Sequence, residues 1–397
     1  MVKECPAFRN ILALAIGILL YAKWPFLAGF LDLLTVAAAT VMVVTAISCL
    51  VVFVGKRNAL HTVIVFAVGI LCGMALASAH DKLSNNGGGW QAEMAQGSAA
   101  MRDKVMTIYK ANGMEGNEFA VVSAMTLGEK SLLDRNLRQE YSRAGIAHVL
   151  ALSGTHLAIL YFILTLLIGK GSVASRFILI GAIWCYVVIV GMPASAVRSA
   201  VMLSMFTLSD VMRRGYDRFD TLVFAVFVML LFEPFIIFDV GFQLSVMSVG
   251  AIIVICPLLD GLLPMDFAMG NPWLSKFWNM VVVSVAAQMG SAPLIAYYFG
   301  TVSCWFAVSN LMAIPLTTII LYGAVAIVVS FPVPLLQGVA VHIVGSVAWL
   351  MNRMSAMIAE MPFAYIDGIN MTVAQLLVSY ILIAVVLLLI KYLQVKQ

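Results

Sequence analysis

The sequence predicts an all-α integral membrane protein, a polytopic helical bundle of about 12 transmembrane helices. Two observations carry this prediction. First, 63% of the 397 residues are hydrophobic and only 11% are charged, against roughly 25% charged residues in an ordinary soluble domain. Second, the apolar runs are about 20 residues long and apolar on every face, whereas barrel strands alternate apolar and polar residues over about ten positions.

The apolar runs predict the individual spans in order. The first run follows Lys3 and Arg9 but is not followed by a small-residue cleavage site, so we expect a retained span rather than a signal peptide. The run at 302–330 contains Pro315, which predicts a tilted, kinked or re-entrant element. The predicted spans are 11–22, 30–54, 60–79, 147–168, 174–191, 195–212, 219–236, 240–259, 277–299, 302–330, 336–358 and 371–390.

Lysine and arginine in the short loops predict the orientation, because cytoplasmic loops are enriched in these residues. With a cytoplasmic N-terminus, the short outer loops and span ends hold only Lys23, Lys82 and Arg353. The inner loops hold Lys3, Arg9, Lys56, Arg57, Lys170, Arg176, Arg213, Arg214, Arg218, Lys276, Lys391 and Lys396. We therefore expect a multi-pass protein of the inner (plasma) membrane with both termini in the cytoplasm and residues 80–143 outside.

These patterns divide the chain into three parts: an N-terminal three-span segment (1–79), an extracytoplasmic linker (80–143) and a channel-type domain (144–397). The linker is too polar to span the membrane, but its apolar residues recur at helical spacing. We expect amphipathic outer helices, which form either a structural collar or a vestibule over a pore. The first predicted helix carries an apolar stripe of Met101, Val105, Ile108 and Tyr109 and ends at Asn112-Gly113. The second runs from Asn117 to Gly128. The third starts with a capping box at Ser131–Asp134 and continues through Leu137 and Tyr141.

The first polar stretch within the spans runs from His148 to His156 and includes Ser153, Gly154 and Thr155. Three interpretations stay open: a polar helix break, a pore-lining site, and a Ser153–His156 catalytic dyad. The two histidines are eight residues apart, about 12 Å along a helix, so they cannot chelate one metal. The Ser153 and His156 side chains can contact each other, because they are three residues apart on a helix. No acidic residue lies near enough in the sequence to orient the imidazole.

Three further stretches place polar side chains at membrane depth, where each needs a partner or water. Arg198 lies about one turn inside a span and either reaches the outer interface or faces a wet cavity. Asp239 is a candidate ion-pair partner for it. Prolines and amides at this depth predict broken helices that line cavities. The remaining candidates for the path are Gln243, Gln288 and Asn310.

The sequence carries no metal or cofactor signal. None of its five histidines forms an H-x-H or H-E-x-x-H motif, and its six cysteines are scattered without a C-x-x-C pair. We expect the cysteines to be apolar packing residues and the protein to work without a cofactor.

These stretches, taken in order, resemble the ComEC family of competence proteins. The resemblance rests on Leu127-Gly128-Glu129, on 144–156 with both histidines, on Ser195–Ala200, on Glu233-Pro234 with 239–245, and on 288–293, 299–300 and 310–315. It covers about 120–330 and implies an inner-membrane channel that translocates single-stranded transforming DNA, not an enzyme. The candidate path residues are then His148, Ser153, Gly154, Thr155, His156, Arg198, Asp239, Gln243, Gln288 and Asn310.

The sequence departs from the family in two respects. About 20 residues separate the third span from the first outer helix, too few for the family's OB-type domain, and no histidine-rich motif of a metallo-β-lactamase-like domain is present. The expected partners are single-stranded DNA, membrane lipid and a separate DNA receptor, nuclease and cytoplasmic motor. Tyr161, Trp184 and Tyr186 are expected either to stack on bases or to pack. The alternatives are a secondary transporter of a small solute and a membrane-embedded enzyme.

Overall fold

The computed structural model describes residues 6–23, 89–169, 171–211, 217–261, 272–330 and 333–396. It divides the chain into two compact units, one of residues 1–92 and 212–243 and one of residues 93–211 and 244–397. In the first unit, α1 (Pro6–Lys23) packs against α11 (Arg218–Phe232) and the 3-10 helix η3 (Pro234–Phe238). The predicted spans at 30–54 and 60–79 lie outside the described residues.

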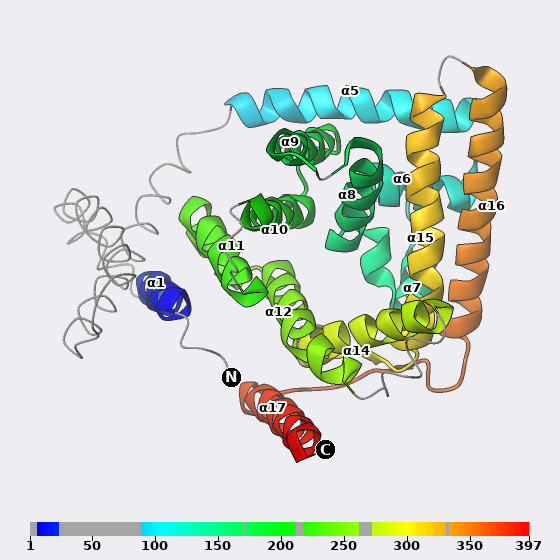
Figure 1. The fold of residues 1–397 in the computed structure, drawn as a ribbon. Coiled ribbons are helices and arrows are strands. Elements are labelled where there is room, and N and C mark those ends of the chain that lie inside the picture. The colour runs from blue at the N-terminus through cyan, green and yellow to red at the C-terminus, as the bar shows by residue number, and fades with distance from the viewer. Residues whose placement is uncertain are drawn as a thin grey trace. The chain divides into compact units, whose positions relative to one another are not determined.

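The second unit is almost entirely helical (Figure 1). Its antiparallel two-residue strands β1 (Val302–Ser303) and β2 (Tyr365–Ile366) join the chain before α15 to the chain after α16. The helices are α5 (Gly89–Ala111), α6 (Gly116–Leu127), α7 (Arg135–Arg143), η2 (Ala147–Leu150), α8 (Gly154–Ile168), α9 (Val173–Ile189), α10 (Ala194–Val211), α12 (Val240–Asp260), α14 (Pro272–Phe299), α15 (Phe306–Val329), α16 (Pro334–Ala359) and α17 (Val373–Lys396), with α5 and α12 beginning in the first unit.

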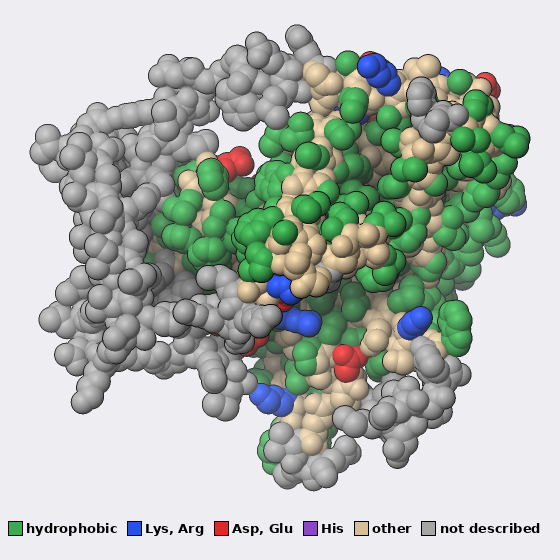
Figure 2. Space-filling model, turned by 45° about the horizontal axis from the view of Figure 1, so that its top comes forward, with side chains coloured by type: hydrophobic (Ala, Val, Ile, Leu, Met, Phe, Trp, Pro, Cys, Tyr) green, Lys and Arg blue, Asp and Glu red, His purple; other side chains and the backbone are tan. Residues whose placement is uncertain are grey.

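Five of the described helices are long and apolar enough to cross a membrane: α12, α14, α15, α16 and α17. Shorter apolar helices lie at Ile11–Leu20, Gly154–Ile168 and Val173–Ile189. Hydrophobic side chains cover much of the described surface in Figure 2, and those of α17 are exposed along most of its length. Such a surface is expected of a protein that faces lipid, so the chain is an all-α membrane protein; the count of about 12 spans stays a prediction.

Helices α15 and α16 pack side by side in the second unit (Figure 1). Gly323 of α15 faces Val344 of α16 so closely that a Cβ atom at Gly323 would overlap the valine side chain. Small residues allow helix backbones in membranes to approach closely. The buried faces of both helices then enclose α6, α7 and η2 in one hydrophobic core.

Prolines at membrane depth predicted broken helices; the re-entrant alternative at 302–330 is wrong, whereas a tilted or kinked helix there stays a prediction. Pro293 lies inside the continuous helix α14, and Pro315 lies inside α15. A proline removes one backbone hydrogen bond, but neighbouring helices and side chains can stabilise the helix around it. The path residues next to these prolines, Gln288 and Asn310, therefore lie on regular helices.

The linker helices differ from their sequence patterns in three respects. Helix α6 is buried over the whole stretch from Phe119 to Leu127, so it is a core helix and not an amphipathic one. It begins after Glu115 rather than at Asn117, and it ends as predicted at Gly128, whose φ is 73°. The third helix is capped by the Asp134 carboxylate, which accepts a hydrogen bond from Arg135 N at 2.7 Å, rather than by Ser131.

Candidate functional site

The chain between η2 and α8 contains the helix break that the sequence predicts. Ala151 and Ser153 have extended backbone conformations, and α8 starts at Gly154. Ser153 is the N-cap, and its backbone N–H donates to Nδ1 of His156 at 3.1 Å. The Ser153 hydroxyl lies 2.7 Å from the same nitrogen. The pair forms a capping box in which histidine occupies the position usually held by glutamate or glutamine.

The environment of His156 favours this capping role over a catalytic dyad. The side chain is 1% exposed, and because its Nδ1 accepts the Ser153 N–H, the neutral ring carries its proton on Nε2. In the described part of the chain, Nε2 makes no hydrogen bond. A Ser–His pair needs a third group to orient the imidazole, and no acid holds this ring.

The start of α10 packs against this break. The Ser195 hydroxyl donates to the carbonyl oxygen of Leu152 at 2.6 Å, and a Cβ atom at Gly154 would lie 3.1 Å from Ser199 Oγ. Two helix N-termini therefore meet, and each brings the partial positive charge of a helix start. No local pattern in the sequence predicts this contact between the 148–156 stretch and the start of α10.

Arg198 lies on the same turn of α10 as Ser195 and Ser199, about 6 Å from the start of the helix. The residue is 6% exposed. An arginine that reached to the membrane surface would be more accessible than this, so the structure favours an interior position. Its permanent positive charge belongs to the first turns of α10, the helix whose start contacts the break.

Of the other predicted path residues, His148 lies close enough to His156 for their charges to interact, and the rest do not join this group in the described contacts. His148 lies exposed on η2, and Gln288 of α14 and Asn310 of α15 are half-buried. Asp239 and Gln243 belong to the first unit. There Asp239 Oδ1 accepts from Phe242 N at 2.7 Å, and Gln243 Nε2 donates to Ile237 O at 2.9 Å. Both residues thus support the turn into α12, and the Arg198–Asp239 pair stays a prediction.

The structure adds a contact that sequence reasoning missed. Arg102 of α5 donates from Nη1 to the carbonyl oxygen of Val190 at 3.1 Å, at the end of α9. Glu129 lies in the loop after α6 and accepts hydrogen bonds from the Ser131 hydroxyl and N–H, which together with the charge of Arg102 hold its pKa below the usual value. Arg102 is 88 residues from Val190, so no local pattern reveals this contact.

The three aromatic residues considered for base stacking pack between helices. The Tyr161 hydroxyl accepts from Thr207 at 3.0 Å, Trp184 Nε1 donates to Ser204 at 3.1 Å, and the Tyr186 hydroxyl donates to Thr126 O at 2.8 Å. Their rings pack against a hydrophobic cluster of α8, α9 and α10. These contacts favour the packing interpretation. Among the described residues, no three His, Cys, Asp or Glu side chains are grouped to hold a metal ion.

The fold and the site together define a class: a helical membrane protein with a buried arginine beside a broken helix. The chain belongs to the Competence protein family, whose sequence model matches residues 125–393, about two thirds of its length. The matched region includes the helix break, Arg198, the candidate membrane helices α12, α14, α15 and α16, and most of α17.

Curated relatives are similar over about half of the chain. ComE operon protein 3 of Bacillus subtilis is 26% identical over 210 residues, which are 52% of this chain and 26% of the relative. Competence protein ComA of Neisseria gonorrhoeae is 25% identical over 254 residues (59% of this chain, 35% of the relative), and an uncharacterised protein of Aquifex aeolicus is 27% identical over 251 residues (62% and 56%). The chain thus spans between a quarter and a little over half of these relatives. No solved structure matches it.

Proposed function

We propose that the protein is an inner-membrane channel that translocates single-stranded transforming DNA into the cytoplasm during competence. The observation that carries the proposal is the buried Arg198 beside the joined N-termini of α8 and α10, inside the region that matches the Competence family. The family match and the name of one relative, Competence protein ComA, support a role in DNA uptake.

The chemistry of this site fits a phosphodiester. A DNA strand needs positive charge to offset its phosphates, and helix N-termini offer N–H donors and a favourable dipole to anions. Arg198 adds a planar donor fork that matches a phosphate. Gly154 and Thr155 are exposed on the first turn of α8, where their backbone is open to a ligand. The channel acts by binding and guiding the strand, without a catalytic step, so the receptor, nuclease and motor are separate proteins.

The direct test is uptake of labelled DNA. A strain that lacks the gene should bind fluorescent duplex DNA at its surface but accumulate no single-stranded DNA in the cytoplasm, and the full-length gene should restore accumulation. A DNA channel predicts this result because only the membrane step is lost. Normal accumulation in the deletion strain would contradict the proposal and would favour transport of another solute.

The proposed orientation predicts a specific labelling pattern. In a variant without native cysteines, Ser131→Cys should react with a membrane-impermeant maleimide in intact spheroplasts, because the loop after α6 is outside and Ser131 is exposed. Gly171→Cys, between α8 and α9, is the matched position on the other side and should react only after lysis. The reverse pattern would place both termini outside.

A further inference from the structure

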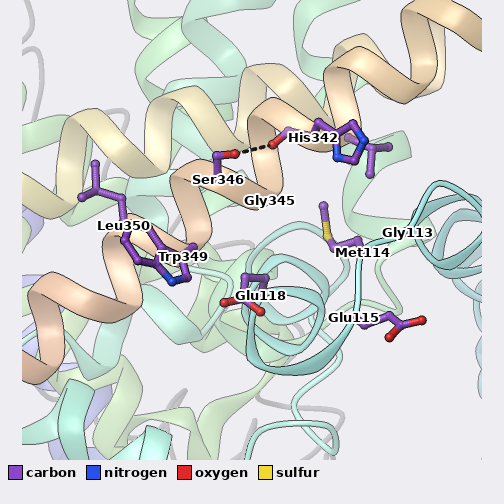
Figure 3. Close-up of a pocket in the computed structure, with 10 residues that line it drawn as sticks. Gly113, Met114, Glu115, Glu118, His342, Gly345, Ser346, Trp349 and Leu350 are labelled. Atoms are coloured by element: carbon purple, nitrogen blue, oxygen red, sulfur yellow. Dashed lines mark hydrogen bonds between the residues drawn. The ribbon is translucent and has the colours of Figure 1, made fainter.

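A groove runs between the turn that joins α5 to α6 and the exposed face of α16 (Figure 3). Its volume is about 660 Å³. The turn supplies Glu115 and Glu118, and α16 supplies His342, Ser346 and Trp349. The other lining residues are Gly113, Met114, Val341, Gly345 and Leu350, so two carboxylates and no lysine or arginine line the groove.

The turn holds the two carboxylates in place. Gly113 and Gly116 have φ values of 85° and 63°, which let the chain reverse between α5 and α6. Glu115 is the N-cap of α6 and Glu118 lies in its first turn. The Glu118 carboxylate folds back toward Gly116, where a Cβ atom would lie 3.6 Å from its Oε2 atom. Both carboxylates therefore belong to the positive end of the α6 dipole.

The groove lies beside the middle of α16, one of the helices long and apolar enough to cross a membrane, so we place the α5–α6 turn at membrane depth and not outside with the rest of residues 80–143. Helix α16 has 26 residues, about 39 Å, and the stretch from Val341 to Leu350 begins about 10 Å and ends about 24 Å from its first residue. A carboxylate at this depth is costly unless water or a cation faces it. Lipid tails alone are therefore a poor occupant for the groove.

The exposed face of α16 also differs from a lipid-facing surface. His342, Ser346 and Arg353 recur along it at helical spacing, and Trp349 beside them is 58% exposed. Polar side chains on a membrane helix usually face a partner helix or water. Gly345 and Ser346 keep the centre of this face small, which allows another helix backbone to approach closely.

We propose that this groove docks a transmembrane helix of a partner protein, one that carries a lysine or arginine at mid-membrane depth. The cationic group contacts the Glu118 carboxylate, with Glu115 at the rim, and its apolar stem lies against the Trp349 ring, which also attracts the charge. Charge complementarity excludes DNA as the occupant, because two carboxylates repel phosphates. The groove is separate from the α8–α10 site, so this inference does not depend on the proposed DNA path.

The test uses the purified full-length protein in phosphatidylcholine vesicles with synthetic membrane-spanning Leu/Ala peptides. One peptide carries a single central lysine, and its control carries leucine at that position. Energy transfer from a donor on Asp367→Cys, in a variant without native cysteines, to an acceptor on the peptide reports binding. The lysine peptide should bind roughly tenfold more tightly than the leucine peptide, because a charge in lipid gains most from a carboxylate partner.

Two variants decide the assignment. The double variant Glu115→Gln with Glu118→Gln should bind both peptides equally, whereas Glu360→Gln, which removes a carboxylate at the end of the same helix, should keep the preference. Thermal unfolding confirms that each variant is folded. Equal binding of both peptides by the parent protein would overturn the proposal, as would a preference that survives in the double variant. Strong transfer between two labelled copies without peptide would assign the face to self-association instead.

Discussion

Arg198→Gln is expected to lower transformation by at least about a hundredfold at unchanged protein level, because it removes a buried charge that a phosphate would otherwise meet. Arg198→Lys should retain part of the activity, roughly a tenth, since an ammonium still attracts phosphate but lacks the bidentate fork. The measurement is transformation frequency divided by the amount of membrane-inserted protein. Arg198 is 6% exposed, so the surrounding protein rather than bulk water sets the strength of this interaction.

The control for this substitution is Arg135→Gln. Arg135 is an exposed arginine at the start of α7, and its loss changes the net charge by the same amount. It should transform at the parental frequency. If Arg198→Gln also transforms normally, the guanidinium is not part of the path. If Arg198→Gln fails to accumulate in the membrane while Arg198→Lys accumulates, the charge serves folding rather than transport.

Gly290→Ala is expected to give the largest loss of stability from a single methyl group. A Cβ atom at this position of α14 would lie 2.5 Å from the carbonyl oxygen of Met247 and 2.6 Å from Cβ of Ala251, both on α12. Backbone atoms cannot rotate away, so the two helices must separate. We expect a loss of about 2 to 3 kcal/mol, the usual cost of overpacking a core.

The matched control is Gly181→Ala in the middle of α9. A Cβ atom there would meet nothing within 4 Å, so the change should be neutral or stabilise the helix by up to about 1 kcal/mol. Thermal unfolding in detergent, followed by intrinsic fluorescence, compares the two variants with the parent. Equal melting temperatures for Gly290→Ala and Gly181→Ala would show that α12 and α14 are not in close contact at this crossing.

Much of the local structure is encoded in short stretches of the sequence. The predicted spans at 174–191, 195–212, 240–259 and 336–358 agree with α9, α10, α12 and α16 to within about two residues. The break before α8 was also predictable, because Ser-Gly-Thr is a poor helix interior and Ser153 is a good cap. Each of these features depends on neighbours only a few residues away.

Other features depend on residues far apart in the chain and were not predictable from short stretches of sequence. The pattern at Phe119, Val122 and Met125 indicated one apolar face, but α6 is buried on all sides because α15 and α16 pack around it. Pro293 and Pro315 indicated breaks, yet both lie within continuous helices. In each case, residues far away in the chain supply the contacts that decide the outcome.

The sequence by itself determined the class of this protein, an all-α membrane protein, and which polar residues interrupt its apolar stretches, because hydropathy and helix signals are local properties. Only the tertiary structure decided which of these residues meet. The hydroxyl of Ser195 reaches the carbonyl oxygen of Leu152 across 43 positions, and the Glu118 groove needs a turn and a helix more than 200 residues apart. Such contacts follow from helix packing, which depends on the shape of whole surfaces and leaves no signal within one stretch of sequence.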